Sequence, residues 1–186
     1  MYLSYYGLVE KPFQISTDPR FLWYGEKHSE ALANLRYGLL ERNGYVVLTG
    51  DVGTGKTTLI NALLASLNDK VVFANINHPT LDTIEFMRFV ARKFDPAVSA
   101  QSKADLVSFF QTFLQKAHAR GKIVLLVVDE AQRLSMEVLE ELRLLSNLEK
   151  SGDRLLNIML VGQNELKPLL AAPSVPCAAP ADHALL

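Results

Sequence analysis

Residues 45–58 read YVVLTGDVGTGKTT, and the interpretation of the whole chain starts from this stretch. Four apolar or β-branched residues, VVLT, run into a glycine-rich turn with the spacing G-x-x-x-x-G-K-[ST], from Gly50 to Thr57. A buried strand that feeds such a turn is typical of a phosphate-binding loop, with a helix after it. The alternative is an ordinary glycine-rich turn with a chance Lys-Thr pair. The spacing favours a nucleotide site in an α/β fold.

The residue types in this loop suit phosphate chemistry. Glycines allow positive φ angles and bring backbone N–H groups close to phosphate oxygens. Lys56 supplies a positive charge for the β- and γ-phosphates, Thr57 offers its hydroxyl to Mg²⁺, and the following helix adds its dipole. The predicted nucleotide-binding residues are Gly50, Asp51, Val52, Gly53, Thr54, Gly55, Lys56, Thr57 and Thr58.

A second chemical signal follows an unbroken apolar run, IVLLVV, at residues 123–128. Such a run predicts a strand buried on both faces of a parallel sheet, and ligands bind at the carboxyl edge of such sheets. Asp129 and Glu130 come directly after it. We expect Asp129 to hold Mg²⁺ through water and Glu130 to polarise the attacking water as a general base. The alternative is a solvated acidic pair that starts a turn.

A third signal lies at the end of the predicted strand 155–161, which leads into Gly162, Gln163 and Asn164. A polar amide at this position, beside the strand that bears Asp129, would lie where the γ-phosphate meets the attacking water. We assign this sensing role to Gln163 and count it among the catalytic residues with Lys56 and Glu130. Asn164 is the rival, and an ordinary turn residue is the other reading.

Hydrophobic periodicity places these motifs on regular elements. Apolar residues at helical spacing predict helices from Ser29 to Arg42, after the loop to about Asn68, from Thr80 or Asp82 to Phe94, from Ser102 to Gly121 and from Ser135 to Glu149. Another short strand is expected at 71–76. His28, just before the first of these helices, is interpreted as a cap or surface residue in preference to a nucleotide contact.

Composition restricts the class of protein. The chain has 186 residues, 49% of them hydrophobic, and a net charge of -1, which gives no general attraction to nucleic acid or anionic lipid. No apolar run reaches the roughly 18 residues of a membrane span, and no leader pattern opens the chain, so we expect a cytoplasmic protein. The single Cys177 cannot form an internal disulfide and is expected to be an unstructured thiol.

Three regions are predicted along the chain. Residues 1–28 carry Tyr and Phe side chains among turn residues and are expected to pack on the core, either as plain aromatic packing or as a wall for a purine base. Residues 29–172 form the nucleotide-binding core. Residues 173–186 are rich in Pro and Ala and are expected to be a disordered tail.

These motifs together resemble the AAA+ branch of phosphate-loop ATPases and, within it, the general secretion pathway protein A (ExeA-like) family. The resemblance covers about residues 1–172. It rests on the segments MYLSYYGLVEKPF, DPRFLWYGEKHSEALANLRYGL, GDVGTGKTTL (the Walker A motif), LLVVDEAQ (Walker B) followed by LEELRLLSNLE, and LVGQNEL.

The resemblance implies a three-layer αβα architecture with a five-stranded parallel sheet in the order 5-1-4-3-2. It also implies Mg²⁺-dependent ATP hydrolysis with Lys56, Thr57, Asp129 and Glu130 in the roles given above, and Gln163 as first sensor. Homo-oligomers and a partner in an envelope, exopolysaccharide or secretion apparatus are further implications. A DNA-binding ATPase of the transposition-regulator kind and a nonenzymatic nucleotide-binding fragment are the alternatives.

The ending APSVPCAAPADHALL departs from that family, whose members continue with a basic stretch, a fifth strand and a helical lid. We therefore expect the fifth strand, an arginine finger and the lid to be missing, the edge of the first strand to be open, and nucleotide binding and turnover to be weak. A frameshift is our hypothesis for this ending, because codons read one nucleotide later from Val175 can spell the basic sequence SRALRQRITRY. Resequencing the DNA tests it.

Overall fold

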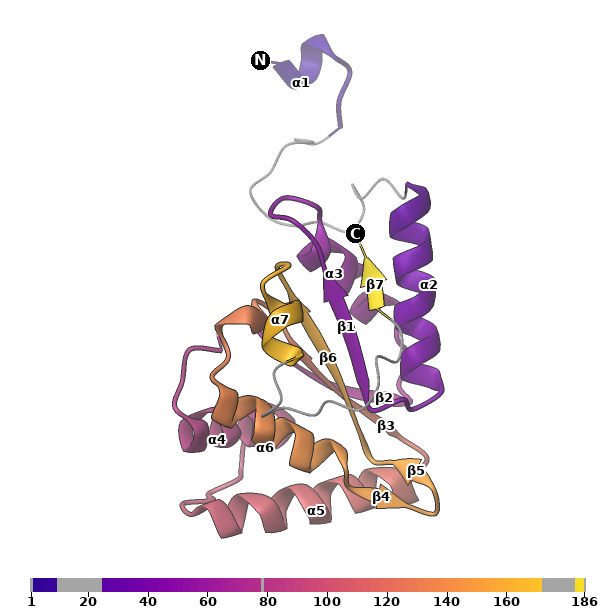
Figure 1. Cartoon of the computed structure of the whole chain (residues 1–186). Helices are drawn as coiled ribbons and strands as arrows, with labels where there is room; N and C mark the ends of the chain where they lie inside the picture. The colour runs from indigo at the N-terminus through magenta and orange to yellow at the C-terminus, as the bar shows by residue number, and fades with distance from the viewer. Residues whose placement is uncertain (1, 10–24, 78, 172–182, 186) are drawn as a thin grey trace.

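The computed structural model describes residues 2–9, 25–77, 79–171 and 183–185. Its elements, labelled in Figure 1, are α1 Tyr2–Tyr5, α2 Glu26–Leu40, β1 Tyr45–Thr49, α3 Lys56–Ser66, β2 Val71–Ile76, α4 Thr83–Phe94, α5 Lys103–Ala119, β3 Ile123–Val128, the 3-10 turn η2 Ala131–Arg133, α6 Met136–Ser146, β4 Glu149–Lys150, β5 Asp153–Arg154, β6 Leu156–Gly162, α7 Leu166–Leu170 and β7 His183–Leu185. The expected tail residues 173–182, Cys177 among them, lie outside the described residues.

The main sheet has the strand order β2-β3-β6-β1-β7, and every neighbouring pair is parallel. Numbered by their appearance along the chain, β1, β2, β3, β6 and β7 are strands 1 to 5 of this sheet. The observed order, read from β7 to β2, is therefore the predicted order 5-1-4-3-2. Parallel neighbours need a crossover, and helices supply it, as Figure 1 shows for α4 and α5 between β2 and β3. The α/β class and the parallel sheet are therefore confirmed.

Alternate residues of the strands pack into two separate cores, which makes the three layers. In β1, Val46 and Leu48 join the core under α2 and α3, whereas Val47 joins the core under α4, α5 and α6. The other strands alternate in the same way: Leu125 and Val127 of β3 belong to the first core, and its residues 124, 126 and 128 to the second. Burial on both faces explains why the strands read as unbroken apolar runs.

Two helices start at the caps that the sequence predicts. The Asp82 carboxylate accepts a hydrogen bond from the Glu85 N–H at 2.8 Å. Ser102 and Asp105 form a reciprocal capping box, in which the Ser102 N–H donates to Asp105 Oδ2 at 2.9 Å and the Asp105 N–H donates to Ser102 Oγ at 3.2 Å. These caps satisfy N–H groups that the helices themselves leave free.

The expected absence of a fifth strand is corrected by β7. Residues 183–185 pair in parallel with β1, in the register Val47 with His183, Leu48 with Ala184 and Thr49 with Leu185. The edge of β1 is therefore covered along part of its length, and these three residues are not a free tail. The physical reason is that an open strand edge presents unpaired N–H and C=O groups, which a short extended segment can satisfy.

Removal of residues 183–186 is expected to lower the free energy of unfolding by about 1–3 kcal/mol, because a few ladder hydrogen bonds to β1 are lost. Urea denaturation followed by circular dichroism measures this change. Removal of Leu186 alone is the control and should have no effect of this size. Equal unfolding free energies for the parent chain and the shorter variant would show that β7 contributes nothing to the sheet.

The N-terminal segment differs from its prediction where the structure describes it. Tyr5 and Tyr6 are 82% and 69% exposed, and α1 stands apart from the layers in Figure 1. The expected packing on the core is not seen at these two residues, and Phe13, Phe21, Trp23 and Tyr24 of the same segment lie outside the described residues. The predicted boundary between residues 28 and 29 falls inside α2. The division into three regions stays a prediction.

Candidate nucleotide site

The phosphate-loop residues connect β1 to α3 at the carboxyl edge of the sheet. Gly53 and Gly55 have φ angles of 82° and 85°, a conformation that glycine adopts without the cost of a Cβ. A Cβ on Gly53 would meet nothing within 4 Å, so the backbone itself forms an open cradle there. The loop is closed by the Thr54 hydroxyl, which donates to the Asp51 carbonyl at 2.9 Å. The tip is exposed, and Val52 is 78% accessible.

Lys56, the first residue of α3, is a buried cation. Its side chain is held by two backbone carbonyls, because Nζ donates to the oxygens of Gly50 and Asp51 at 2.8 Å each. Only 8% of the residue is exposed, and no carboxylate forms an ion pair with it within the described parts of the chain. A buried charge is costly unless an anion balances it. The neutral partners of Lys56 therefore leave its charge available for a phosphate.

Thr57 and Asp129 lie in direct contact although 72 residues separate them. The Thr57 hydroxyl donates to Asp129 Oδ2 at 2.8 Å. Asp129 is 7% exposed and follows the last residue of β3, so the sheet brings it to the start of α3. The predicted approach of the loop to the acidic pair is therefore present in the fold.

The oxygens of this pair fit Mg²⁺. A hydroxyl and one carboxylate are a common protein contribution to a magnesium site, since Mg²⁺ keeps several waters and binds substrate phosphates. No group of three or more His, Cys, Asp or Glu side chains able to hold a metal occurs among the described residues. The donor set thus suits a hydrated Mg²⁺ shared with a nucleotide better than a closed all-protein metal site.

Glu130 has an unusual backbone conformation. It caps η2 with φ 54° and ψ 36°, in the left-handed region that non-glycine residues rarely occupy. Its side chain accepts a hydrogen bond from Gln132, with 2.7 Å between Nε2 and Oε2. Residues held in such conformations are concentrated at functional sites. The geometry is compatible with the predicted role of Glu130 as a general base.

The end of β6 meets the loop through Asn164 and meets η2 through Gln163. Asn164 Nδ2 donates to Asp51 Oδ1 at 2.7 Å, so the rival sensor residue contacts the phosphate loop directly. The backbone N–H of Gln163 donates to Gln132 Oε1 at 3.1 Å. The sensing role of the Gln163 side chain stays a prediction.

His28 also reaches the phosphate loop. Its Nε2 lies 3.0 Å from the Thr54 carbonyl oxygen, and a Cβ built on Gly55 would lie 3.5 Å from the same nitrogen. The interpretation of His28 as a cap or surface residue is therefore wrong. The first turn of α2 approaches the loop because α2 and α3 pack side by side on one face of the sheet, which local sequence spacing does not reveal.

His28→Ala is expected to weaken ATP binding by about three- to tenfold, because a neutral hydrogen bond of roughly 0.5–1.5 kcal/mol no longer restrains the loop at Thr54. Isothermal titration calorimetry measures the affinity. His118→Ala is the matched control, since the ring of His118 contacts Asp153 near the amino ends of the strands. Equal affinities in the parent chain and His28→Ala would remove His28 from the site.

Besides the contact of His28 with Thr54, two further contacts of the site were missed by sequence reasoning. Gln132 was given no role although it follows Glu130 at a fixed distance of two residues in the DEAQ segment, which was a usable signal. The contact of Asn164 with Asp51 was indicated in the sequence only by the position of a polar residue near the end of a strand.

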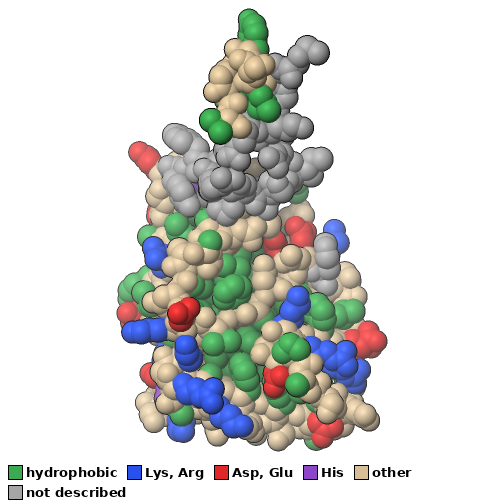
Figure 2. All heavy atoms as spheres, turned by 180° about the vertical axis from the view of Figure 1, so that it is seen from behind, with side chains coloured by type: hydrophobic (Ala, Val, Ile, Leu, Met, Phe, Trp, Pro, Cys, Tyr) green, Lys and Arg blue, Asp and Glu red, His purple; other side chains and the backbone are tan. Residues whose placement is uncertain are grey.

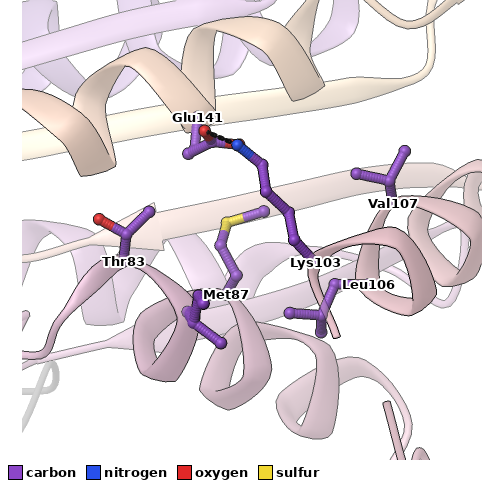
Figure 3. A pocket seen from close by; sticks show the side chains of 7 residues that line it. Thr83, Met87, Lys103, Leu106, Val107 and Glu141 are labelled. Atoms are coloured by element: carbon purple, nitrogen blue, oxygen red, sulfur yellow. Dashed lines mark hydrogen bonds and ion pairs between the residues drawn. The ribbon is translucent and has the colours of Figure 1, made fainter. Parts of the chain in front are cut away.

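A small hollow between α4, α5 and α6 can be compared with the phosphate loop as a possible ligand site (Figure 3). Its lining includes the side chains of Met87 and Leu106, and the polar groups Lys103 and Glu141 are already paired with each other across it. It contains neither a free charge nor a glycine-rich backbone. The phosphate loop is therefore the better candidate for a nucleotide.

The parallel sheet, the loop at the end of β1 and the acidic residues after β3 define a phosphate-loop nucleotide-binding domain. A family model described as "AAA domain" matches residues 40–170, which is most of the chain. The chain belongs to the AAA domain family.

Individual relatives agree with this class. The chain is 41% identical over 174 residues to general secretion pathway protein A of Aeromonas hydrophila, which covers 93% of this chain but 32% of that protein. The chain thus spans about a third of the length of this relative.

Two solved structures show the same fold. The ORC2 protein of Aeropyrum pernix, in ADPNP-ADP complexes, has a TM-score of 0.60 and 19% identity, covering 87% of this chain and 48% of its own. Cdc6p of Pyrobaculum aerophilum has a TM-score of 0.58 and 21% identity, and the match covers 86% of this chain and 45% of the Cdc6p chain. At such identities the likeness concerns the fold alone.

Proposed function

We propose that this chain binds ATP with Mg²⁺ and hydrolyses it to ADP and phosphate. The observation that supports this most strongly is the hydrogen bond of 2.8 Å between Thr57 and Asp129, because it brings the phosphate loop and the acidic strand end to one place. The buried charge of Lys56 and the strained backbone of Glu130 are adjacent to this contact in sequence.

Each residue has a separate task in this proposal. Backbone N–H groups of the loop and the Lys56 ammonium bind the phosphates. Thr57 and Asp129 hold the metal, which supplies charge neutralisation at the phosphate oxygens when bound. Glu130 orients the attacking water and accepts its proton on a carboxylate oxygen. Gln163 or Asn164 contacts the terminal phosphate from the end of β6.

The identity with general secretion pathway protein A supports a role in energising or regulating an envelope, secretion or exopolysaccharide apparatus. Homo-oligomerisation and an envelope protein partner are part of the same proposal. Among the described residues, no helix is both long and apolar enough to cross a bilayer. The relative is about three times longer than this chain. A partner contact made by this domain must therefore be tested with this domain alone.

The test is a titration of the purified chain with ATP, ADP and GTP, with and without Mg²⁺, followed by single-turnover hydrolysis with the chain in excess. We expect saturable ATP binding that Mg²⁺ strengthens, and slow release of phosphate. Absence of saturable binding of every nucleotide would contradict the proposal. Binding without phosphate release would retain the nucleotide site and remove the enzymatic part, which corresponds to the nonenzymatic nucleotide-binding fragment named above.

A basic surface favours DNA as a second candidate partner. Figure 2 shows Lys and Arg side chains gathered at the lower end of the back face. Around the amino ends of the strands, opposite the phosphate loop, basic side chains outnumber acidic ones: Arg42, Lys70, Lys116, Arg120, Lys122, Lys150 and Arg154 against Glu41, Asp69, Glu149 and Asp153. Arg42 and Arg154 are paired with Asp153 and Glu149. The exposed basic residues of this group are Lys70, Lys116, Arg120 and Lys150, and exposed Lys and Arg side chains suit contacts with backbone phosphates.

Binding to duplex DNA at rising salt concentration distinguishes the two candidates. Affinity that falls steeply between about 50 and 200 mM salt would favour the DNA-binding ATPase. Lys70→Glu and Arg120→Glu would then weaken binding without changing ATP affinity. No measurable binding at low salt would leave the apparatus role as the only candidate.

A further inference from the structure

Gln132 joins the acidic residue Glu130 to the end of β6 through both ends of one carboxamide. Nε2 donates to Glu130 Oε2 at 2.7 Å, and Oε1 accepts from the Gln163 N–H at 3.1 Å. We infer that Gln132 is a positioning residue that fixes the Glu130 carboxylate for hydrolysis. This inference rests on the proposed ATP hydrolysis.

The two partners define which side chain fits. A carboxylate only accepts hydrogen bonds and a backbone N–H only donates, so the bridging group must donate at one end and accept at the other. The amide of Gln132 meets this requirement in a single orientation. A carboxylate in its place would keep the bond to Gln163 and repel Glu130, and an alkyl side chain would lose both bonds.

The fold leaves space for this bridge at Gly162. A Cβ built there would lie 2.6 Å from Gln132 Oε1, which is closer than side chains approach in real proteins. Gly162 is the last residue of β6, pairs with Thr49 of β1, and is not among the glycines with a positive φ angle. Its lack of a side chain is therefore explained by the carboxamide above it and not by a turn.

The bridge restrains the side chain of a residue whose backbone is already fixed. Glu130 sits at the start of a three-residue turn in the left-handed region, where its N–H donates to Asp129 Oδ1 at 2.9 Å and its carbonyl accepts from the Arg133 N–H at 2.9 Å. The opposite anchor, the Gln163 N–H, belongs to the residue that follows the buried strand β6. Gln132 thus ties Glu130 to the strand whose next residue, Asn164, contacts the phosphate loop. Misplacement of a catalytic group by about 1 Å can cost roughly 100-fold in rate.

The first test uses the nucleotide-free chain and needs no activity. Amide hydrogen exchange by NMR should show that the Gln163 N–H exchanges about tenfold faster in Gln132→Ala than in the parent chain, because its acceptor is gone. In Gln132→Glu it should stay protected, since a carboxylate oxygen can accept the bond. The Leu160 amide within β6 is the internal control. Equal exchange of the Gln163 amide in all three chains would overturn the bridge.

The second test measures single-turnover ATP hydrolysis. Gln132→Ala and Gln132→Glu should both lower the rate at saturating ATP by about ten- to 100-fold with ATP affinity within about threefold of the parent. In a Glu130→Gln background, neither change should lower the rate further, because the residue that is positioned is already absent. Gly162→Ala should displace the carboxamide and reproduce the loss of rate, with folding checked by thermal denaturation.

The outcomes separate this inference from the proposed function. A parent chain that hydrolyses ATP and an equally fast or faster Gln132→Ala would overturn the positioning role and leave the ATPase proposal intact. A lower ATP affinity of Gln132→Ala that by itself accounts for its lower rate of hydrolysis would also overturn the positioning role. A parent chain that binds ATP without hydrolysing it would overturn the hydrolytic function and this inference together, even with the bridge confirmed by hydrogen exchange.

Discussion

Glu130→Gln is expected to lower the rate of ATP hydrolysis by about 10²- to 10⁴-fold, while ATP affinity stays within about threefold of the parent chain. An amide has nearly the shape of a carboxylate but cannot accept the proton of the attacking water. Glu130 follows Asp129, whose contact with Thr57 places this turn beside the phosphate loop. Single-turnover phosphate release and calorimetric titration measure the two quantities separately.

The matched control is Glu41→Gln, which removes an exposed carboxylate in the loop before β1, at the other end of the sheet. This variant should match the parent chain in both rate and affinity. Equal turnover in the parent and Glu130→Gln would remove Glu130 from its role. A combined loss of rate and affinity would indicate that the amide disturbs the turn that Gln132 and Glu130 share.

Lys56→Ala is expected to weaken ATP binding by about ten- to 100-fold, because a charge-assisted contact with phosphate contributes roughly 1.5–3 kcal/mol. The charge of Lys56 is buried and its partners are the carbonyls of Gly50 and Asp51, so no carboxylate of the described chain competes with the nucleotide. The affinity difference should be larger for ATP than for a nucleoside without phosphates.

Lys70→Ala is the control for Lys56→Ala, since it removes an exposed cation at the amino end of β2. Thermal denaturation of both variants separates nucleotide affinity from folding, because loss of Lys56 also frees the two carbonyls that hold the loop. Unchanged ATP affinity in Lys56→Ala, with a folded chain, would contradict the assignment of the loop to phosphate binding.

The strands of the main sheet could be predicted well where burial on both faces forces an unbroken apolar run. The predicted range 123–128 coincides with β3, which is buried on both faces. The predicted range 71–76 coincides with β2, a partly buried edge strand that its apolar residues still mark. Asp82, Ser102 and Ser135, at the predicted helix starts, are the observed capping residues. These signals are local, since a strand buried on both faces and a capped helix each carry their pattern in neighbouring residues.

The features that escaped prediction depend on contacts between distant segments. The strand β7 has three residues and no periodicity, so its pairing with β1 follows from the open edge and not from its own sequence. The contact of His28 with Thr54 joins residues 26 positions apart, and that of Gln132 with Gln163 joins residues 31 apart. In both cases the residue type was visible, whereas its partner was set by the tertiary fold: α2 lies beside α3 on one face of the sheet, and β3 pairs with β6.

The candidate site itself could be predicted to a greater extent, because two strong motifs follow β1 and β3, two strands of one parallel sheet that are separated only by β6. The spacing that ends in Thr57 and the acids after β3 determine the chemistry, and the strand order determines their approach, observed as the hydrogen bond of 2.8 Å between Thr57 and Asp129. The choice between Gln163 and Asn164 as sensor needs the bound nucleotide, since both follow β6, the Asn164 side chain bonds to Asp51 of the loop, and the Gln163 backbone N–H bonds to Gln132 of η2.

The most direct measurement is a crystal structure of the Glu130→Gln chain grown with ATP and Mn²⁺, with anomalous diffraction used to locate the metal. A single manganese peak beside the Thr57 hydroxyl and the Asp129 carboxylate, with the triphosphate wrapped by residues 50–57, is the result expected. A triphosphate bound elsewhere, or a metal remote from both side chains, would contradict the claim that the loop and the acidic pair form one site.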